Sequence, residues 1–277
     1  MTKPIFLLGV GAQKAGTTWL HKYLRSHPEV DLGFMKEYHV FDQKYVLDTT
    51  PSSKQRIKNY LRSFLGSDSR SIRNKFRRNH KHYFSYFRKL VDSPDQVFIT
   101  GDITPSYAAL PVKVLQYIKS SLEKNGFRVR VIFLMRDPVA RCISANRMYS
   151  SPRLLDSPGD AALEAELLAK KYQQTRFQIR TRYDQTINNL EQVFTSDELY
   201  LGFYEELFSD KAIAEICSFL ELPFRPGKYK QVVHGSLVKS ELPETIKSEV
   251  RSYYSQVYDF VLNRFGQDRV KKLWKMK

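Results

Sequence analysis

The chain has 277 residues, 42% of them hydrophobic and 13% aromatic, which fits one large folded domain. Lysine and arginine total 45 against 29 aspartates and glutamates, so the net charge of +16 favours anionic partners. The surplus is uneven, because residues 52–91 hold twelve lysines and arginines and one acid. The apolar runs are too short for a membrane span and the first residues do not resemble a signal peptide, so we expect a cytoplasmic protein.

Two cysteines, Cys142 and Cys217, fall in segments with helical patterns. Two thiols allow one bridge at most, which excludes a disulfide scaffold and a cysteine-based zinc site. We expect both to be buried free thiols in a reducing compartment.

Four short apolar runs predict strands, at residues 5–10, 96–100, 129–135 and 198–203. Helical patterns lie between and after them, at residues 17–26, 111–124, 138–149, 160–194 with a break, 209–220 and 243–264. Strands that alternate with helices indicate an α/β fold, a single domain with a central, mostly parallel sheet flanked by helices. The less regular segment 52–91 predicts a basic helical excursion over the sheet.

The first predicted strand runs into the loop GAQKAGTT, residues 11–18. The helix that follows offers free backbone N–H groups and the positive end of its dipole, which together attract an anion. Gly11 and Gly16 let the backbone approach a phosphate closely, and the threonines add hydroxyl donors. In a nucleoside-triphosphate loop a lysine directly follows the second glycine. Here Thr17 holds that place and Lys14 lies two residues before the glycine, so a different phosphorylated ligand is indicated.

A second candidate phosphate site lies in VIFLMRDPVARCISANRMYS, residues 131–150. The strand ends at Arg136, and Asp137 is placed to cap a helix that begins with Pro138. Ser144 follows about two helical turns later, so that a guanidinium and a hydroxyl converge on one phosphate. Taken alone, this pattern is more typical of an ordinary helix cap with a surface arginine. Two further arginines either assist or form a solvated face: Arg141 and Arg147.

The stretch QKAGTTWL, residues 13–20, resembles the 5′-phosphosulfate loop of sulfotransferases that use 3′-phosphoadenosine 5′-phosphosulfate (PAPS). Residues 131–150 are similar to the 3′-phosphate motif of the same family. Residues 204–207 and the C-terminal helix also resemble it, whereas 52–91 and 151–175 lie outside the resemblance. The resemblance implies a P-loop-like sulfotransferase fold, with PAPS bound by Lys14, Ala15, Gly16, Thr17, Thr18, Trp19, Arg136 and Ser144.

The polar stretch MKEYHVFD, residues 35–42, resembles the Lys-Glu-x-His-Phe-Phe element of heparan-sulfate-type sulfotransferases. The glutamate is the proposed base of those enzymes, so the resemblance assigns Glu37 as base and Lys36 to positioning the sulfuryl group. By the same resemblance, Lys14 stabilises the leaving phosphate. His39 is a competing base, because the ordinary pKa of histidine suits proton transfer near neutral pH. Without the resemblance, such a stretch is typical of a solvated turn.

The stretch GDITPSY, residues 101–107, follows a predicted strand and resembles another element of the same subgroup. Asp102 matches its acidic position and is assigned to the substrate, with a helix-capping role as the alternative. Ile103 replaces the lysine of many heparan-type enzymes, which disfavours a heparan-like acceptor. The basic loop that closes over the cofactor in many sulfotransferases has no clear counterpart, and the nearest candidates are His234 and Lys239.

The predicted activity is transfer of a sulfuryl group from PAPS to a hydroxyl, or less readily an amine, of an acceptor, leaving 3′,5′-ADP. The heparan-type elements favour a carbohydrate acceptor, and no metal is expected. A P-loop kinase and a basic nucleic-acid-binding protein are the alternatives, although no nucleic-acid-binding motif accompanies the charge. The basic segment is interpreted first as a solvated helical face and second as a contact for an anionic glycan.

Overall fold

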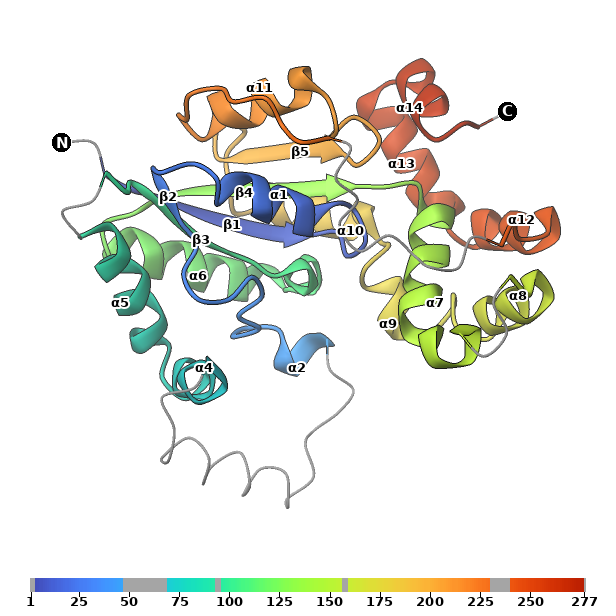
Figure 1. Cartoon of the computed structure of the whole chain (residues 1–277), viewed down its shortest axis with the longest axis horizontal. Helices are drawn as coiled ribbons and strands as arrows, with labels where there is room; N and C mark the ends of the chain where they lie inside the picture. The colour runs from blue at the N-terminus through green and yellow to red at the C-terminus, as the bar shows by residue number, and fades with distance from the viewer. Residues whose placement is uncertain (1–2, 47–68, 93–95, 156–158, 230–239, 277) are drawn as a thin grey trace.

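Five parallel strands form the centre of the protein in a computed structural model, which describes residues 3–46, 69–92, 96–155, 159–229 and 240–276 (Figure 1). The strands are β1 (Ile5–Gly11), β2 (Val30–Asp31), β3 (Ile99–Ile103), β4 (Arg128–Met135) and β5 (Leu199–Phe203). Their order is β2-β3-β1-β4-β5, and every pair of neighbours is parallel. All seven residues of β1 are buried, as expected of a central strand that helices cover on both faces.

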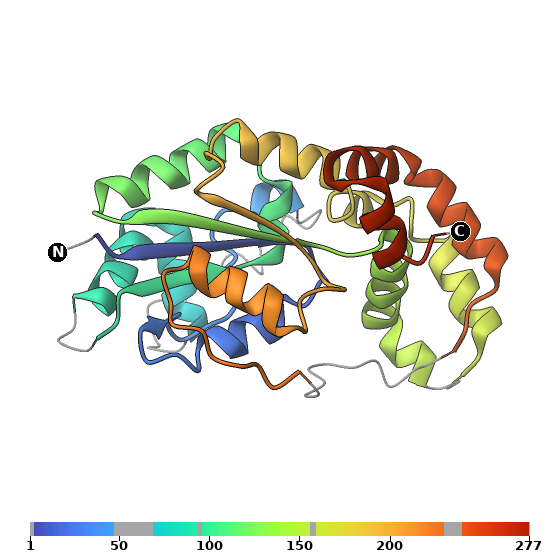
Figure 2. The same ribbon diagram turned by 90° about the horizontal axis from the view of Figure 1, so that it is seen from above.

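Helices cover both faces of this sheet (Figure 2). In the view from above, α6 and α10 lie on one face, and α1 and α11 lie on the other. The helices α7, α8, α9, α12 and α13 gather beyond the carboxyl ends of the strands (Figure 1). The described helices are α1 (Thr17–Leu24), α2 (Gln43–Val46), α4 (Ser69–Arg78), α5 (His80–Val91), the 3-10 helix η1 (Pro105–Ala109), α6 (Val112–Lys124), α7 (Pro138–Leu155), α8 (Ala161–Ala169), α9 (Thr175–Gln178), α10 (Tyr183–Glu191), α11 (Asp210–Phe219), α12 (Glu244–Tyr253), α13 (Ser255–Phe265) and α14 (Gln267–Leu273).

The predicted α/β fold is confirmed, with differences at the boundaries of some elements. The second predicted strand begins later, at Ile99, and extends to Ile103, because β3 pairs with β1 up to that residue. Gly101 permits this pairing, since a Cβ there would lie 2.2 Å from the carbonyl oxygen of Leu7. The predicted helix at 243–264 is two helices that meet at Tyr254. The short elements β2 and α2 are additions that hydrophobic periodicity did not indicate.

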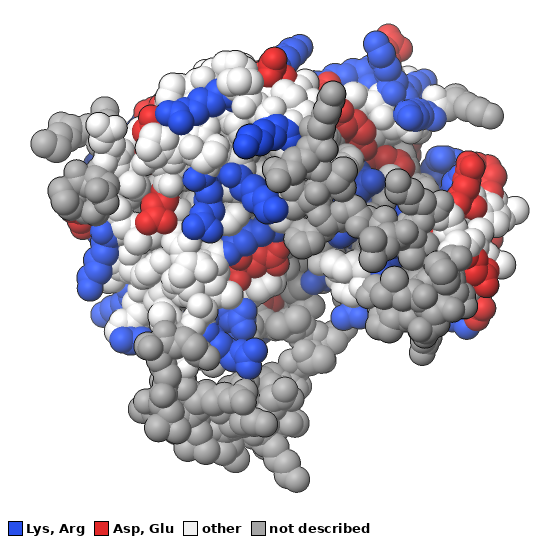
Figure 3. All heavy atoms as spheres, in the orientation of Figure 1, with Lys and Arg blue, Asp and Glu red and all other residues white. Residues whose placement is uncertain are grey.

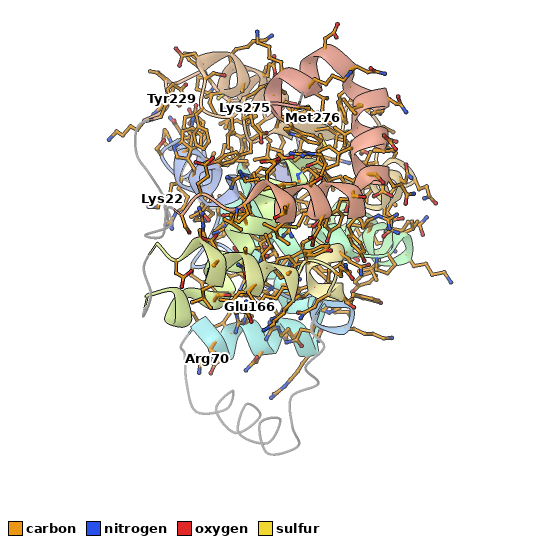
Figure 4. All side chains as sticks on the ribbon, turned by 90° about the vertical axis from the view of Figure 1, so that its right-hand side faces the viewer. Lys22, Arg70, Glu166, Tyr229, Lys275 and Met276 are labelled. Atoms are coloured by element: carbon orange, nitrogen blue, oxygen red, sulfur yellow. The ribbon has the colours of Figure 1, made fainter. Side chains whose placement is uncertain are left out.

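The basic excursion is described only in part. Residues 69–91 form α4 and α5, whereas residues 47–68 lie outside the described part of the chain. Phe76 of α4 is buried among the rings of Phe34, Tyr38, Tyr83 and Tyr86, which anchors the helix on the domain. Seen from the side, α4, marked by Arg70, lies at the opposite edge from Tyr229 and Lys275 (Figure 4).

Two expectations from composition concern the thiols and the membrane. Cys142 in α7 and Cys217 in α11 are buried and free, as predicted. Among the described helices, none has both the length and the apolar character needed to cross a membrane.

Candidate active site

The loop between β1 and α1 has a backbone suited to binding an anion. Gly16 caps α1 with φ 83°, and a Cβ at this position would lie 2.5 Å from Cδ2 of Leu207, so the site requires glycine. Lys14 also has a positive φ, of 70°, which is uncommon for a residue with a side chain. The first N–H groups of α1 lack carbonyl partners within the helix and are available to a ligand at this edge of the sheet.

Three cations meet at this loop. Lys14 is half-buried, and burial lowers the pKa of its ammonium, as do the charges of Arg136 and Lys36. Lys36 donates from Nζ to Oγ1 of Thr17 at 3.3 Å, and Thr17 is buried while Thr18 is half-buried. A bound anion would relieve the mutual repulsion of the cations, so the electrostatics favour a negatively charged ligand.

The second predicted phosphate element meets the first. Arg136 donates from Nη1 to the carbonyl oxygen of Lys14 at 2.9 Å, and its guanidinium lies 4.3 Å from the ring centroid of Tyr204. Its Nε is buried without a hydrogen-bond partner. Asp137 caps α7 as predicted, since Oδ2 accepts from the backbone N–H of Ala140 at 2.9 Å. The same helix, which follows the end of β4, also carries Ser144, and this side chain is half-buried.

The other residues assigned to the nucleotide have mixed surroundings. Ala15 is buried and closes the loop by donating from its backbone N–H to the carbonyl oxygen of Ala12 at 3.2 Å. The Trp19 side chain is 5% exposed, and its ring stacks on Tyr23 at 5.5 Å and 4° and on Tyr229 at 5.9 Å. Trp19 is therefore part of an aromatic stack beside the loop.

Arg141 and Arg147 do not form a solvated face. Arg147 pairs with the buried Glu164 at 2.6 Å and donates to the carbonyl oxygen of Ser240 at 2.7 Å, so it ties α7 to α8. Arg141 is fully buried, with its guanidinium 5.3 Å from the ring centroid of Phe177. Both side chains therefore point into the helical region rather than into solvent.

The polar stretch 36–42 is a continuous hydrogen-bonded chain rather than a solvated turn. Lys36 contacts Oε1 of Glu37 at 2.7 Å, and Oε2 of Glu37 lies 3.2 Å from Nε2 of His39. Nδ1 of His39 lies 2.6 Å from Oδ2 of the buried Asp42, which also accepts from the hydroxyl of Ser106. Both ring nitrogens of His39 are therefore engaged by carboxylates.

This arrangement determines the charge states of His39 and Glu37. Burial disfavours the imidazolium, but the hydrogen bonds to Asp42 and Glu37 outweigh it and raise the pKa of His39 to about 9. Burial also disfavours the carboxylate of Glu37, yet His39 and Lys36 lower its pKa to about 2. At neutral pH, His39 is thus a cation held between two anions.

A buried hydrogen-bond network supports the polar stretch 36–42 from the protein interior. Asp102 is fully buried and accepts hydrogen bonds from Thr104 at 2.6 Å, from Tyr107 at 2.8 Å and from Tyr83 at 3.0 Å. Thr104 Oγ1 accepts from the backbone N–H of Tyr38 at 3.0 Å, so the network holds the stretch in place. The side chain predicted to contact substrate lies beneath the site, and its geometry favours a supporting role.

The family model described as "Sulfotransferase family" matches residues 4–226. The chain belongs to the sulfotransferase family. It therefore transfers a sulfuryl group and requires a sulfuryl donor. This family assignment replaces the kinase and nucleic-acid-binding alternatives. The described residues contain no group of three or more His, Cys, Asp or Glu side chains that could hold a metal.

Solved structures with this fold include a sulfotransferase from Alicyclobacillus acidocaldarius. The two chains are 15% identical with a TM-score of 0.60, and the match covers 95% of this chain and 96% of the other. Mouse sulfotransferase SULT7A1, solved in complex with PAP, is 15% identical with a TM-score of 0.45, over 99% of this chain and 88% of that one. No curated protein gives a significant match.

The sulfotransferase thus brings together most of the residues that its sequence singled out. Lys14, Lys36 and Arg136 meet at the loop, and Glu37 and His39 lie beside them. Sequence reasoning assigned no role to the partners Asp42, Ser106 and Thr104, although all three stand inside the two stretches that it quoted. The nearest candidates for a late basic loop, His234 and Lys239, lie outside the described residues.

Proposed function

We propose that this sulfotransferase moves the sulfuryl group of PAPS to a hydroxyl, or less readily an amine, of a carbohydrate acceptor and leaves 3′,5′-ADP. The observation that carries the proposal is the contact of Arg136 with the backbone of Lys14, which joins two phosphate-binding elements 122 residues apart. Lys36 then links the loop to Glu37. The carbohydrate assignment rests on the resemblance of residues 35–42 to heparan-type enzymes.

The residues present fit a nucleotide with two separate anionic groups. The buried, unpartnered Nε of Arg136 and the half-buried Ser144 would hold the 3′-phosphate. Lys14, Thr17, Thr18 and the N–H groups of α1 would hold the 5′ end. Bound PAPS supplies an activated sulfuryl group. Lys14 would stabilise the negative charge that develops on the 5′-phosphate oxygen when the sulfuryl group leaves.

Glu37 is the group best placed to take the acceptor proton. With the donor bound, Glu37 would take the proton of the acceptor hydroxyl as the acceptor oxygen bonds to sulfur, and the electron pair of the breaking sulfur–oxygen bond would stay on the 5′-phosphate. His39 has both ring nitrogens engaged by carboxylates, so it orients Glu37 instead of acting as base. Lys36 contacts both Glu37 and Thr17, and moving its ammonium onto the bound donor would raise the low pKa of Glu37 towards a useful range.

The test combines turnover with nucleotide binding. Labelled PAPS is incubated with the protein and a panel of glycans, phenols and lipids, and we expect the label in a glycan. Glu37→Gln should lower turnover by about 100-fold or more with unchanged affinity for 3′,5′-ADP. Lys14→Ala should weaken 3′,5′-ADP binding, whereas Lys22→Ala, on the exposed side of α1, should not. Full turnover of Glu37→Gln would remove Glu37 as base, and unchanged nucleotide binding by Lys14→Ala would refute the donor site.

A further inference from the structure

Three arginines from two separate segments interact electrostatically with Asp42, which belongs to the same polar stretch as the proposed base. Arg73 and Arg77 come from α4, and Arg180 comes from the turn between α9 and α10. Burial lowers the pKa of each guanidinium, and the charge of Asp42 raises it in all three, so all three lie within electrostatic reach of one carboxylate. Figures 1 and 2 both show α2, which directly follows Asp42, between α4 and α9.

One of these arginines is tied directly to the polar chain. Arg77 donates from Nε to the carbonyl oxygen of His39 at 2.7 Å. Its pKa is lowered to about 10, by burial first and then by the neighbouring charge of Arg73, with Asp42 opposing both. Lys and Arg side chains are spread over much of the face drawn in Figure 3. Helix α4 ends in the basic residues Lys75, Arg77 and Arg78, and it contacts the site through Arg77.

The other two arginines have donors that nothing in the described chain satisfies. Nε of Arg73 and Nε of Arg180 are both buried without a hydrogen-bond partner, and the Arg180 side chain is only 8% exposed. Arg180 is bonded through Nη1 to the carbonyl oxygen of Arg176 at 2.7 Å, which leaves its charge uncompensated. Burying an unpaired guanidinium donor costs free energy, so both Nε groups lack the hydrogen-bond partner that we expect a ligand to supply.

The single carboxylate of Asp42 cannot balance three arginines. Asp42 already accepts from His39 and from Ser106, and His39 itself is a cation. Among the described residues, Arg73, Arg77 and Arg180 form no ion pair within 4.0 Å, whereas Arg88 pairs with the exposed Asp92 at 2.6 Å. The side of the site next to His39 therefore carries excess positive charge that is partly shielded from water.

We propose that Arg73, Arg77 and Arg180 form a subsite for an anionic group of the acceptor, a carboxylate or a sulfate ester. This makes the acceptor an anionic carbohydrate, one that contains a uronic acid or is already sulfated, and it rests on the proposed function. Guanidinium groups suit this role because their planar N–H pairs match the oxygens of a carboxylate or a sulfate. The bound group pairs the orphaned donors and holds the acceptor hydroxyl near Glu37.

The test uses two sugars that differ only at C6, which is a carboxylate in one and a hydroxymethyl group in the other. Binding of p-nitrophenyl β-D-glucuronide and p-nitrophenyl β-D-glucoside is measured by calorimetry, with and without saturating 3′,5′-ADP. The wild-type protein should bind the glucuronide about tenfold more tightly or better, the ratio expected of one charge-assisted hydrogen bond. Equal affinity for the two sugars, or no measurable affinity for either, overturns the proposal and requires no variant.

Variants then locate the preference. Arg180→Gln and, separately, Arg73→Gln should lower the affinity for the glucuronide about tenfold and leave that for the glucoside unchanged. Lys75→Ala is the matched control, because Lys75 is an exposed cation on the same helix as Arg73. Circular dichroism verifies that both arginine variants are folded. If both still prefer the glucuronide over the glucoside as strongly as the wild type does, the assignment is overturned. If the wild-type protein does not bind 3′,5′-ADP, the proposed function is refuted instead. The two failures are therefore distinguishable.

Discussion

The pairing of His39 with Asp42 and Glu37 leads to a prediction that needs no knowledge of the acceptor. Asp42→Asn keeps the shape of the side chain and removes the charge that lies 2.6 Å from Nδ1 of the imidazole. The contact with Glu37 is longer, at 3.2 Å, so Asp42 should account for more than half of the effect on the imidazole. We expect the pKa of His39 to fall from about 9 to about 7.5 in the variant.

The same interaction contributes to stability. The difference between the ordinary value of 6.5 and about 9 corresponds, at about 1.4 kcal/mol per pKa unit, to about 3 kcal/mol of favourable interaction with the charged ring of His39. Because the pKa is raised on folding, this stabilisation is complete below pH 6.5 and is lost as the pH rises through 9. Asp42→Asn should therefore cost about 2 kcal/mol near pH 6 and clearly less above pH 9.

Nuclear magnetic resonance of the imidazole nitrogens between pH 5 and 10 measures this directly. The chain has six histidines, and the signal of His39 is assigned by its disappearance in His39→Gln. Asp92→Asn is the control, because Asp92 pairs with Arg88 at an exposed site and should leave the titration of His39 unchanged. A wild-type His39 that titrates near 6.5, or an Asp42→Asn protein in which it still titrates near 9, would refute the reasoning.

Three further predictions are checked by urea unfolding. Thr104→Val should cost about 2–3 kcal/mol, because the network under the polar stretch loses its central hydroxyl; a neutral result would show that the network is dispensable. Gly16→Ala should cost about 2 kcal/mol, because its φ is 83°, and an unchanged midpoint would contradict that backbone. Arg147→Ala should cost about 3–5 kcal/mol by stranding the buried Glu164. The exposed Lys170→Ala is its control, within about 0.5 kcal/mol, and equal losses would argue against a buried pair.

The two elements that we propose to bind phosphate could be located in the sequence because the residues of each are close together in the chain. A strand, two glycines, a lysine and a helix start follow one another within residues 5–24, and the order of the residue types already indicates an anion site. The cap of α7 by Asp137 was predicted for the same reason, since capping joins residues three apart. The alternation of apolar and helical segments likewise indicated the parallel sheet, because burial on both faces requires continuous apolar strands.

Sequence alone thus indicated the fold class, the loop proposed to bind the donor and the polar stretch that contains Glu37. The tertiary structure decided which of these groups are charged and what they contact, because a pKa depends on neighbours brought close from elsewhere in the chain. Asp42 and Ser106 stand 64 residues apart, and their contact helps to fix the state of His39. The same packing placed Asp102 beneath the site and brought Arg180 within electrostatic reach of Asp42, and no local pattern encodes either outcome.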